Sequence, residues 1–197
     1  MSSHVDGARR ITGTAVSTDN IAIKYDVAGK GEPTLVFVHC WTCSRASWDA
    51  QAAHFEPRYR VVRLDLAGHG ESGRERINYT IEAFAADVTA VVNKLDAKQV
   101  VLVGHSMGGP VAAEAARQLG ERVIGVVGVD TFYTGFQFPK DRKQVDAMVK
   151  PFEDDFAGNA DGRNSVLATP DAGVGQLFAF PDPVCSAALG NCRAVTA

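Results

Sequence analysis

Hydrophobic and polar residues follow two different periods along the first two thirds of the chain. Short apolar runs rich in valine recur there and are typical of buried strands. Between these runs, apolar residues return every three or four positions, which indicates helices with one buried face. The predicted strands are 10–17, 21–27, 34–38, 59–66, 100–103 and 123–129, and the predicted helices are 47–55, 81–95 and 110–119.

Local signals support several of these boundaries. Thr18-Asp19-Asn20 separates the first two strands and predicts a hairpin turn. Thr80 stands just before the longest helical pattern, where its hydroxyl can cap the helix. From Phe37 onward strands and helices alternate, which is typical of a parallel sheet with helices on both faces. The predicted fold class is therefore α/β, with a doubly wound, mostly parallel sheet.

The pattern changes after the strand that ends at Val129. Residues 140–157 predict an amphipathic helix. Residues 158–197 are rich in small and polar residues and show only weak periodicity. This part of the chain is therefore not expected to continue the alternation of strands and helices.

One strand leads directly into a chemically informative turn. Val100-Val101-Leu102-Val103 is followed by Gly104-His105-Ser106-Met107-Gly108 and then by a helical segment, a G-x-S-x-G pattern between strand and helix. We expect Gly104 and Gly108 to leave room for a tight turn, with the Ser106 hydroxyl standing clear of the sheet. The helix behind Ser106 directs backbone N–H groups and a positive dipole end at nearby negative charge. The alternative is an ordinary glycine-rich turn of a doubly wound domain.

Composition narrows the range of functions. The 197 residues fit one domain, and an apolar fraction of 46% suffices for a core. The net charge is −3 without basic or acidic blocks, which argues against nucleic acid and anionic membranes as partners. The N-terminus lacks the apolar region of a secretory signal, and no apolar run approaches the ~18 residues of a membrane helix. We expect a soluble, cytoplasmic protein, and no metal or organic cofactor is indicated.

The four cysteines leave alternatives open. Cys40-x-x-Cys43 is compatible with a redox pair or with half of a zinc site. Cys185 and Cys192 do not have a usual zinc spacing. In a reducing compartment, free thiols are the expectation for all four.

Three motifs in order resemble the α/β-hydrolase family, in its serine esterase and lipase branch, over residues ~20–135. His39-Cys40-Trp41, followed by Ser47-Trp48, resembles the loop after the third strand of that family. The segment from Asp65 to Ser72 resembles the loop after the fourth strand, and Gly104 to Gly109 resembles the turn that carries the nucleophile.

The resemblance implies roles for several residues. Ser106 is the implied nucleophile, and the backbone N–H of Met107 is one implied donor to the oxyanion. The other donor comes from the loop after the third strand, where position favours the Trp41 N–H; the Trp41 side chain can instead simply wall the pocket. Cys40 stands where the family has glycine, so this loop departs from the pattern. The alternative of Cys40 as a nucleophile is disfavoured, because no base is paired with it.

The implied catalytic base is missing. In this family the order along the chain is serine, acid and histidine, but no residue after Ser106 is a histidine. His39 and His69 follow strands at the edge where such sheets place active sites, so each is either a substitute base or a loop-organising residue. Asp130 ends the strand after the nucleophile and is the candidate acid, with a role in capping or loop binding as the alternative. Asp65 is expected to be structural.

The same resemblance divides the chain into a hydrolase core at 1–133, a cap or lid segment at 134–180 and an atypical tail at 181–197. We then expect the last core strands of the family to be missing from this sequence. A shortened gene, a frameshift or an end point chosen for expression would each explain this. Without them, the strand 123–129 becomes an apolar sheet edge, and such edges pair with other chains. We therefore expect self-association through this edge or poor solubility.

The motifs and the family resemblance favour one function for this chain and leave two alternatives open. The favoured hypothesis is a serine hydrolase that attacks small-molecule carboxylic esters through an acyl-serine intermediate, with weak activity because no histidine follows Ser106. The alternatives are a catalytically inactive hydrolase-fold fragment or binding module, and a C–C hydrolase or perhydrolase on the same fold. Dehalogenases and epoxide hydrolases use an aspartate nucleophile, so Ser106 argues against them.

Overall fold

The computed structural model describes residues 10–131, 141–143, 146–147, 150, 154 and 177–179. The strands are β1 (Ile11–Val16), β2 (Ala22–Ala28), β3 (Thr34–Val38), β4 (Val61–Leu64), β5 (Val100–His105), β6 (Val123–Val129) and β7 (Leu177–Ala179). The α-helices are α1 (Asp49–Phe55), α2 (Ile81–Lys94) and α3 (Gly108–Leu119), and two short 3₁₀ helices are η1 (Arg45–Trp48) and η2 (Gly120–Arg122). The strands and helices predicted from the hydrophobic pattern up to residue 129 are confirmed, with ends shifted by a few residues.

The sheet is mixed and mostly parallel around its centre. Its strand order is β1-β2-β4-β3-β5-β6-β7. The pairs β3–β4, β3–β5 and β5–β6 are parallel, whereas β1–β2 and β2–β4 are antiparallel. Parallel neighbours end at the same edge of a sheet, so the loops after β3, β4, β5 and β6 begin close to one another. The predicted fold class, a doubly wound α/β sheet of the α/β-hydrolase type, is confirmed.

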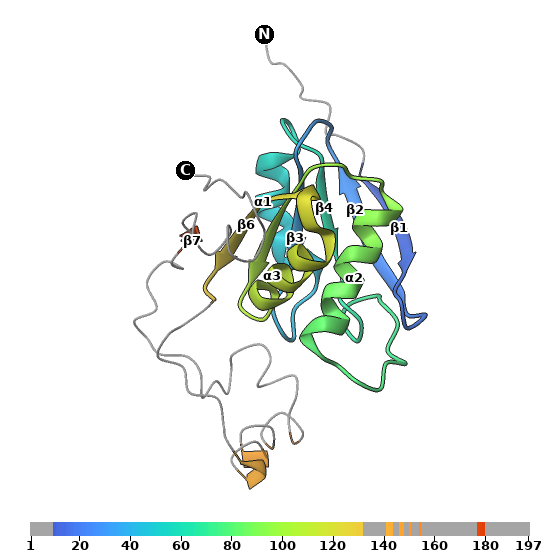
Figure 1. The fold of residues 1–197 in the computed structure, drawn as a ribbon, viewed down its shortest axis with the longest axis vertical. Coiled ribbons are helices and arrows are strands. Elements are labelled where there is room, and N and C mark those ends of the chain that lie inside the picture. The colour runs from blue at the N-terminus through green and yellow to red at the C-terminus, as the bar shows by residue number, and fades with distance from the viewer. Residues whose placement is uncertain are drawn as a thin grey trace. The chain divides into compact units, whose positions relative to one another are not determined.

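Helices cover both faces of the sheet (Figure 1). The helices α2 and α3 pack on one face, where they share a core with Val36, Val38 and Leu102. On the other face, Trp48 of η1 and residues of α1 pack against Leu35 and Phe37. Neighbouring residues of β3 therefore enter opposite cores, as the alternation of side chains along a strand requires. Burial on both faces explains the continuous apolar runs of the central strands.

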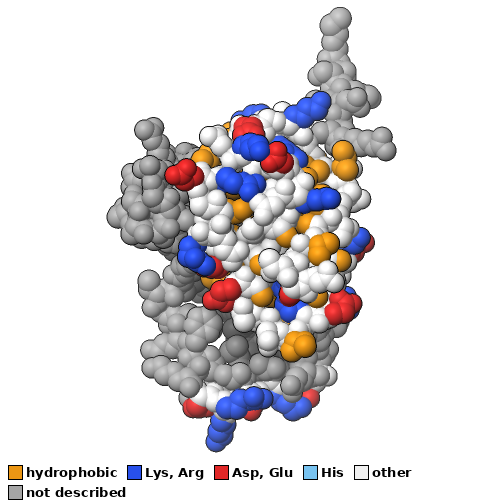
Figure 2. Space-filling view, turned by 45° about the vertical axis from the view of Figure 1, so that its right-hand side comes forward, with side chains coloured by type: hydrophobic (Ala, Val, Ile, Leu, Met, Phe, Trp, Pro, Cys, Tyr) orange, Lys and Arg blue, Asp and Glu red, His pale blue; other side chains and the backbone are white. Residues whose placement is uncertain are grey.

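The N-terminus of α2 is capped as expected. The Thr80 hydroxyl accepts a hydrogen bond from the Ala83 N–H at 3.2 Å, and the Thr80 backbone is extended. This bond satisfies one of the N–H groups that a helix leaves without a partner in its first turn. The side of the molecule turned forward in Figure 2 carries acidic and basic side chains mixed together, consistent with the small net charge.

The edge of the sheet at β6 differs from the expectation. The short strand β7 pairs antiparallel with β6, placing Leu177, Phe178 and Ala179 opposite Val129, Gly128 and Val127. The prediction that all of residues 123–129 form an open edge is therefore wrong for the last three residues of β6. A three-residue strand within the weakly periodic sequence of residues 158–197 has too little pattern to be detected from sequence.

The chain divides into two compact units, residues 1–132 with 177–197 and residues 133–176. In the second unit, residues 142–143, 146–147, 150 and 154 are helical. Ion pairs Arg142–Asp146 and Lys150–Asp154 join residues one turn apart, in agreement with the helix predicted for 140–157. Most of the predicted cap (134–180) and all of the predicted tail (181–197) lie outside the described residues. Within the described part, no helix is both long and apolar enough to cross a bilayer.

Candidate active site

Ser106 lies on a sharp turn between β5 and α3. Its φ angle is +50°, in the left-handed region that residues with a side chain rarely adopt. The residue is exposed, although the residues before and after it are partly buried. A reversed backbone between strand and helix with an exposed serine is the geometry of a nucleophile elbow.

Glycine is sterically required at two positions around this turn. A Cβ atom on Gly104 would lie 2.1 Å from the Gly108 carbonyl oxygen, and a Cβ atom on Gly108 would lie 2.4 Å from the Val38 carbonyl oxygen. Both contacts are with backbone, which cannot move aside as a side chain can. The expected reason for Gly104 and Gly108, room for a tight turn, is therefore confirmed.

Three hydrogen bonds hold the Ser106 backbone. Its N–H donates to the Val129 carbonyl oxygen at 3.0 Å, while its own carbonyl oxygen accepts from the Gly109 N–H at 2.9 Å. The same oxygen accepts from the hydroxyl of Thr131, which is buried, at 2.7 Å. Sequence reasoning missed Thr131; the available signal was a threonine just beyond the strand that neighbours the nucleophile strand.

Met107 directly precedes the first turn of α3. Its φ and ψ angles, −53° and −33°, are already helical. Within residues 10–131 the Met107 N–H donates no hydrogen bond to the protein, as expected for an amide at the start of a helix. An N–H in this position, with the positive end of the helix dipole behind it, is suited to an oxyanion that forms beside Ser106.

The loop after β3 begins against the same helix. The steric limit at Gly108 arises because the carbonyl oxygens of Val38 and His39 approach it closely. Trp41 follows in a turn and is 42% exposed. The structure thus brings the loop that carries Trp41 next to the first turn of α3, while the role of the Trp41 N–H remains a prediction.

A disulfide joins Cys40 and Cys43 across this turn, with 5.4 Å between their Cα atoms. The expectation of free thiols is therefore wrong for this pair. The reason is local geometry: the Cys43 N–H donates to the Cys40 carbonyl oxygen at 3.2 Å, and this turn brings the two side chains together. Cys185 and Cys192 lie outside the described residues.

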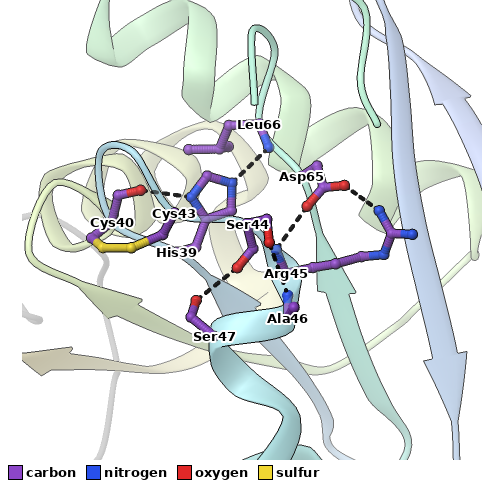
Figure 3. The surroundings of a disulfide bond; sticks show 9 residues. All are labelled: His39, Cys40, Cys43, Ser44, Arg45, Ala46, Ser47, Asp65 and Leu66. Atoms are coloured by element: carbon purple, nitrogen blue, oxygen red, sulfur yellow. Dashed lines mark hydrogen bonds and ion pairs between the residues drawn. A yellow bond between two sulfur atoms is a disulfide. The ribbon is translucent and has the colours of Figure 1, made fainter. Parts of the chain in front are cut away.

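Polar contacts fix the chain on the far side of the disulfide (Figure 3). The Arg45 N–H donates to Asp65 Oδ1 at 2.7 Å, and the Arg45 guanidinium also pairs with the Asp65 carboxylate. Asp65 is fully buried and accepts a further hydrogen bond from the Glu71 N–H at 3.0 Å. Asp65 therefore joins the loops after β3 and β4, which confirms the structural role expected for it.

His39 is fully buried and uses both ring nitrogens. Nε2 accepts from the Leu66 N–H at 3.0 Å, so Nδ1 carries the proton and donates to the Cys40 carbonyl oxygen at 2.7 Å (Figure 3). Burial, which disfavours the charged ring, lowers the pKa of His39 to about 4, against the smaller opposing effect of the bond to Cys40. No ring nitrogen of His39 is left to take a proton from Ser106.

His69 lies next to His39, with ring centroids 5.0 Å apart. It is partly buried, and its Nδ1 donates to the Ala67 carbonyl oxygen at 3.0 Å. This bond places the lone pair on Nε2, the nitrogen that a base uses. His69 therefore has the tautomer of a possible base, and its role as a substitute base remains a prediction.

Asp130 is brought to the same edge as Ser106. The register of β5 and β6 places His105 opposite Val129, so the next residues, Ser106 and Asp130, follow neighbouring strand ends. Asp130 is exposed and has a φ angle of +46°. Its position fits the implied acid, but no histidine that it could orient lies after Ser106 in this sequence.

A groove of about 340 Å³ lies elsewhere, lined by residues that include Val16, Ala90 and Gln118. Gln118 is at the C-terminal end of α3, roughly 15 Å along the helix from the end that carries the elbow. The groove is therefore separate from Ser106.

A nucleophile elbow at the carboxyl edge of a doubly wound sheet defines the class of α/β hydrolases. The chain belongs to the alpha/beta hydrolase fold family, whose model matches residues 33–165. The family named from the three sequence motifs is thus confirmed.

Known relatives agree with this class and differ in activity. A non-heme chloroperoxidase of Burkholderia pyrrocinia is 41% identical over 93 residues, which are 46% of this chain and 34% of that protein. A solved esterase from Rhodococcus sp. ECU1013 is 33% identical, with a TM-score of 0.57 over 61% of this chain and 46% of that one. A thermophilic esterase from Thermogutta terrifontis is 29% identical, with a TM-score of 0.63 over 77% and 56% of the two chains. This chain thus spans from a third to just over half of the length of these proteins.

Proposed function

We propose that this chain is a serine hydrolase that attacks small carboxylic esters through an acyl-serine intermediate. The observation that carries the proposal is the exposed Ser106 at positive φ, with the Met107 N–H beside it at the start of α3. Esterases among the solved relatives support the choice of ester as substrate.

The proposed reaction has two steps. Ser106 Oγ bonds to the ester carbonyl carbon, the bond to the alcohol oxygen breaks, and the alcohol leaves with the serine proton. Water then attacks the acyl-serine, which releases the acid and restores the hydroxyl. In both steps negative charge forms on the carbonyl oxygen, where the N–H groups of Met107 and Trp41 are the proposed donors. Losing one such donor typically costs about 2.7–4 kcal/mol of transition-state stabilisation.

Slow turnover is part of the proposal. A serine hydroxyl is a weak nucleophile near neutral pH unless a base takes its proton, and none of the five histidines follows Ser106 in the sequence. An oxyanion hole and substrate binding alone still give an acceleration of about 10³–10⁴ over water. We propose His69 as the candidate substitute base, since the tautomer set by its bond to Ala67 suits proton acceptance.

A second candidate is perhydrolysis. The 41% identity to a chloroperoxidase named as non-heme favours it. In this reaction hydrogen peroxide replaces water as the acceptor of the acyl group from Ser106, so that a peracid forms and the serine is restored. The same nucleophile serves both candidates, and only the acceptor differs.

The test compares the hydrolysis of p-nitrophenyl acetate by the wild-type chain and by Ser106→Ala, with and without added hydrogen peroxide. We expect a low rate for the wild type and the buffer rate for Ser106→Ala. A hydrolysis rate below that of the wild type in His69→Ala, but not in the matched variant His54→Ala, would identify His69 as the base. Equal rates for the wild type and Ser106→Ala would contradict the proposal and leave an inactive hydrolase-fold protein or a binding module.

A further inference from the structure

The Cys40–Cys43 disulfide closes the turn that contains Trp41 and Thr42. Both cysteines are partly buried and not enclosed in the core, so a small dithiol can reach the bond. In Figure 3 the disulfide lies at the end of the loop away from the Arg45–Asp65 pair. A reducible bond thus brackets Trp41, whose N–H is a proposed donor to the oxyanion, and its neighbour Thr42.

Thr42, inside the closed turn, has a φ angle of +63°. A β-branched residue at positive φ is a backbone outlier, and such conformations persist only where the surroundings impose them. The disulfide is the covalent restraint on this turn, supplemented by the bond from the Cys43 N–H to the Cys40 carbonyl oxygen. Breaking the disulfide removes the restraint, and Thr42 is then expected to return to negative φ.

Both flanks of the turn are held independently of the disulfide. On one side, β3 runs through the middle of the sheet, and the His39 ring is bonded to Leu66. On the other side, the Ser44 side chain accepts from the Ala46 N–H, and Asp65 holds Arg45. A change in the turn is therefore confined to residues 40–43 and does not require unfolding of the core.

The residues that lead into the turn are anchored beside the nucleophile elbow through backbone contact. The Val38 and His39 carbonyl oxygens lie so close to Gly108 that a Cβ atom there would be 2.4 and 2.8 Å away. The Cys40 carbonyl oxygen, next along the chain, accepts from His39 Nδ1 at 2.7 Å. The peptide units that lead to Trp41 thus begin against the first turn of α3, which follows Ser106.

We propose that Cys40 and Cys43 form a thiol–disulfide exchange site whose oxidised form holds the Trp41 loop in the shape that favours acylation of Ser106. The inference rests on the proposed function, because it concerns regulation of that site. A thiolate of an external dithiol bonds to one sulfur, the Cys40–Cys43 bond breaks, and the released sulfur takes a proton. The second thiol of the reductant then displaces the remaining cysteine and closes a disulfide. The reductant loses two electrons and two protons, and the pair gains them.

The principal experiment measures the rate at which a fluorophosphonate probe labels Ser106 before and after treatment with dithiothreitol. Alkylation of free thiols and peptide mass spectrometry establish the redox state of Cys40 and Cys43 in each sample. Reduction is expected to slow labelling at least about tenfold, a fraction of the effect of losing an oxyanion donor outright. The double variant Cys40→Ser/Cys43→Ser is expected to label slowly in both conditions.

The second pair of cysteines supplies the matched control. Cys185→Ser/Cys192→Ser removes the other two cysteines of the chain and is expected to keep the full response to dithiothreitol. A response that disappears in this control, or wild-type labelling that is equally fast in both redox states, overturns the inference while leaving the proposed function intact.

A structural readout separates the two proposals. The chain has two tryptophans, exposed Trp41 and buried Trp48, so in Trp48→Phe the fluorescence reports Trp41 alone. Reduction is expected to change its emission and its quenching by acrylamide. Absence of Ser106 labelling in both redox states overturns the proposed function and, with it, the effect of the disulfide on acylation. The redox-dependent change in the Trp41 loop is then decided by Trp41, whose unchanged fluorescence on reduction overturns it.

Discussion

Ser106 is held in a strained conformation by groups that bond only to its backbone. The Val129 carbonyl oxygen accepts a hydrogen bond from the Ser106 N–H, whereas the Gly109 N–H and the Thr131 hydroxyl donate to the Ser106 carbonyl oxygen. Among the described residues the Ser106 hydroxyl itself makes no hydrogen bond, so the reactive atom is not committed to the protein. Backbone strain of this kind persists where the surrounding structure determines it, and it is concentrated at functional sites.

Thr131 is the side chain that holds the elbow most directly. Thr131→Val keeps the shape and removes the hydroxyl that donates to the Ser106 carbonyl oxygen, and we expect a loss of about 1 kcal/mol in the free energy of unfolding. We also expect slower labelling of Ser106 by a fluorophosphonate. Thr131→Ser retains the donor and is the matched control. Labelling that is unchanged in Thr131→Val would show that the elbow holds its shape without this bond.

His39 makes stability depend on pH. Its pKa is lowered to about 4 in the folded chain, below the ~6.5 of an exposed histidine. Between these values the unfolded state binds the proton and the folded state does not, so stability is lost as pH falls from ~6.5 to ~4 and is retained above ~6.5. The contribution of this group is about 3 kcal/mol at most.

The measurement is urea unfolding near pH 7.5 and near pH 4.5 for the wild type and His39→Gln, whose amide can replace both hydrogen bonds without titrating. The loss of unfolding free energy on acidification is expected to be smaller in the variant. An equal loss in both proteins would mean that other groups account for the acid sensitivity.

At the scale of elements, the site depends on how closely α3 approaches β5 and the end of β3. Gly104→Ala places a methyl group 2.1 Å from the Gly108 carbonyl oxygen, and we expect a loss of about 3 kcal/mol in the free energy of unfolding, together with loss of probe labelling. Gly125→Ala, where the nearest atom is a Val101 methyl group at 3.7 Å, is the control. Similar unfolding curves for the two variants would contradict the packing described for the elbow.

The same elements show what sequence can predict. The strands β3 and β5 were predictable because each is a continuous apolar run, and α2 because Thr80 marks its start. The elbow followed from a local pattern of two glycines and a serine. The Arg45–Asp65 pair and the bond from Thr131 to Ser106 depend on backbone positions set by different strands, so no local pattern contains them. Cys40 and Cys43 are close in sequence, but the spacing alone was equally compatible with free thiols, and only the turn between them shows the disulfide. The histidine tautomers likewise required the positions of Leu66 and Ala67.

At the scale of the molecule, four loops that follow parallel strands meet at one edge of the sheet. They carry Trp41 after β3, His69 after β4, Ser106 after β5 and Asp130 after β6. This edge is where doubly wound sheets place their sites. The sheet topology, and not proximity in sequence, is what brings these residues to a common place.

The two borders of the sheet lead to a prediction about association. Over residues 10–131 and 177–179, β7 covers only Val127–Val129 of β6, and β1 pairs only with β2. Open strands pair with other chains, so we expect light scattering to detect a concentration-dependent dimer through the remaining part of β6. Val16→Lys on β1, where Val16 is exposed, should leave the dimer unchanged. A monomer at every concentration would contradict the prediction, and a dimer lost in Val16→Lys would move the interface to β1.

The proposed chemistry requires Ser106 to be a nucleophile presented to solvent, and covalent capture is the direct measurement of this property. The wild-type chain is incubated with a fluorophosphonate, digested and mapped by mass spectrometry, with Ser106→Ala and heat-unfolded wild type as controls. We expect a single phosphonyl adduct on Ser106 that forms slowly in the folded chain and is absent from both controls. An adduct on other residues only, or the same labelling of folded and unfolded chains, would contradict it.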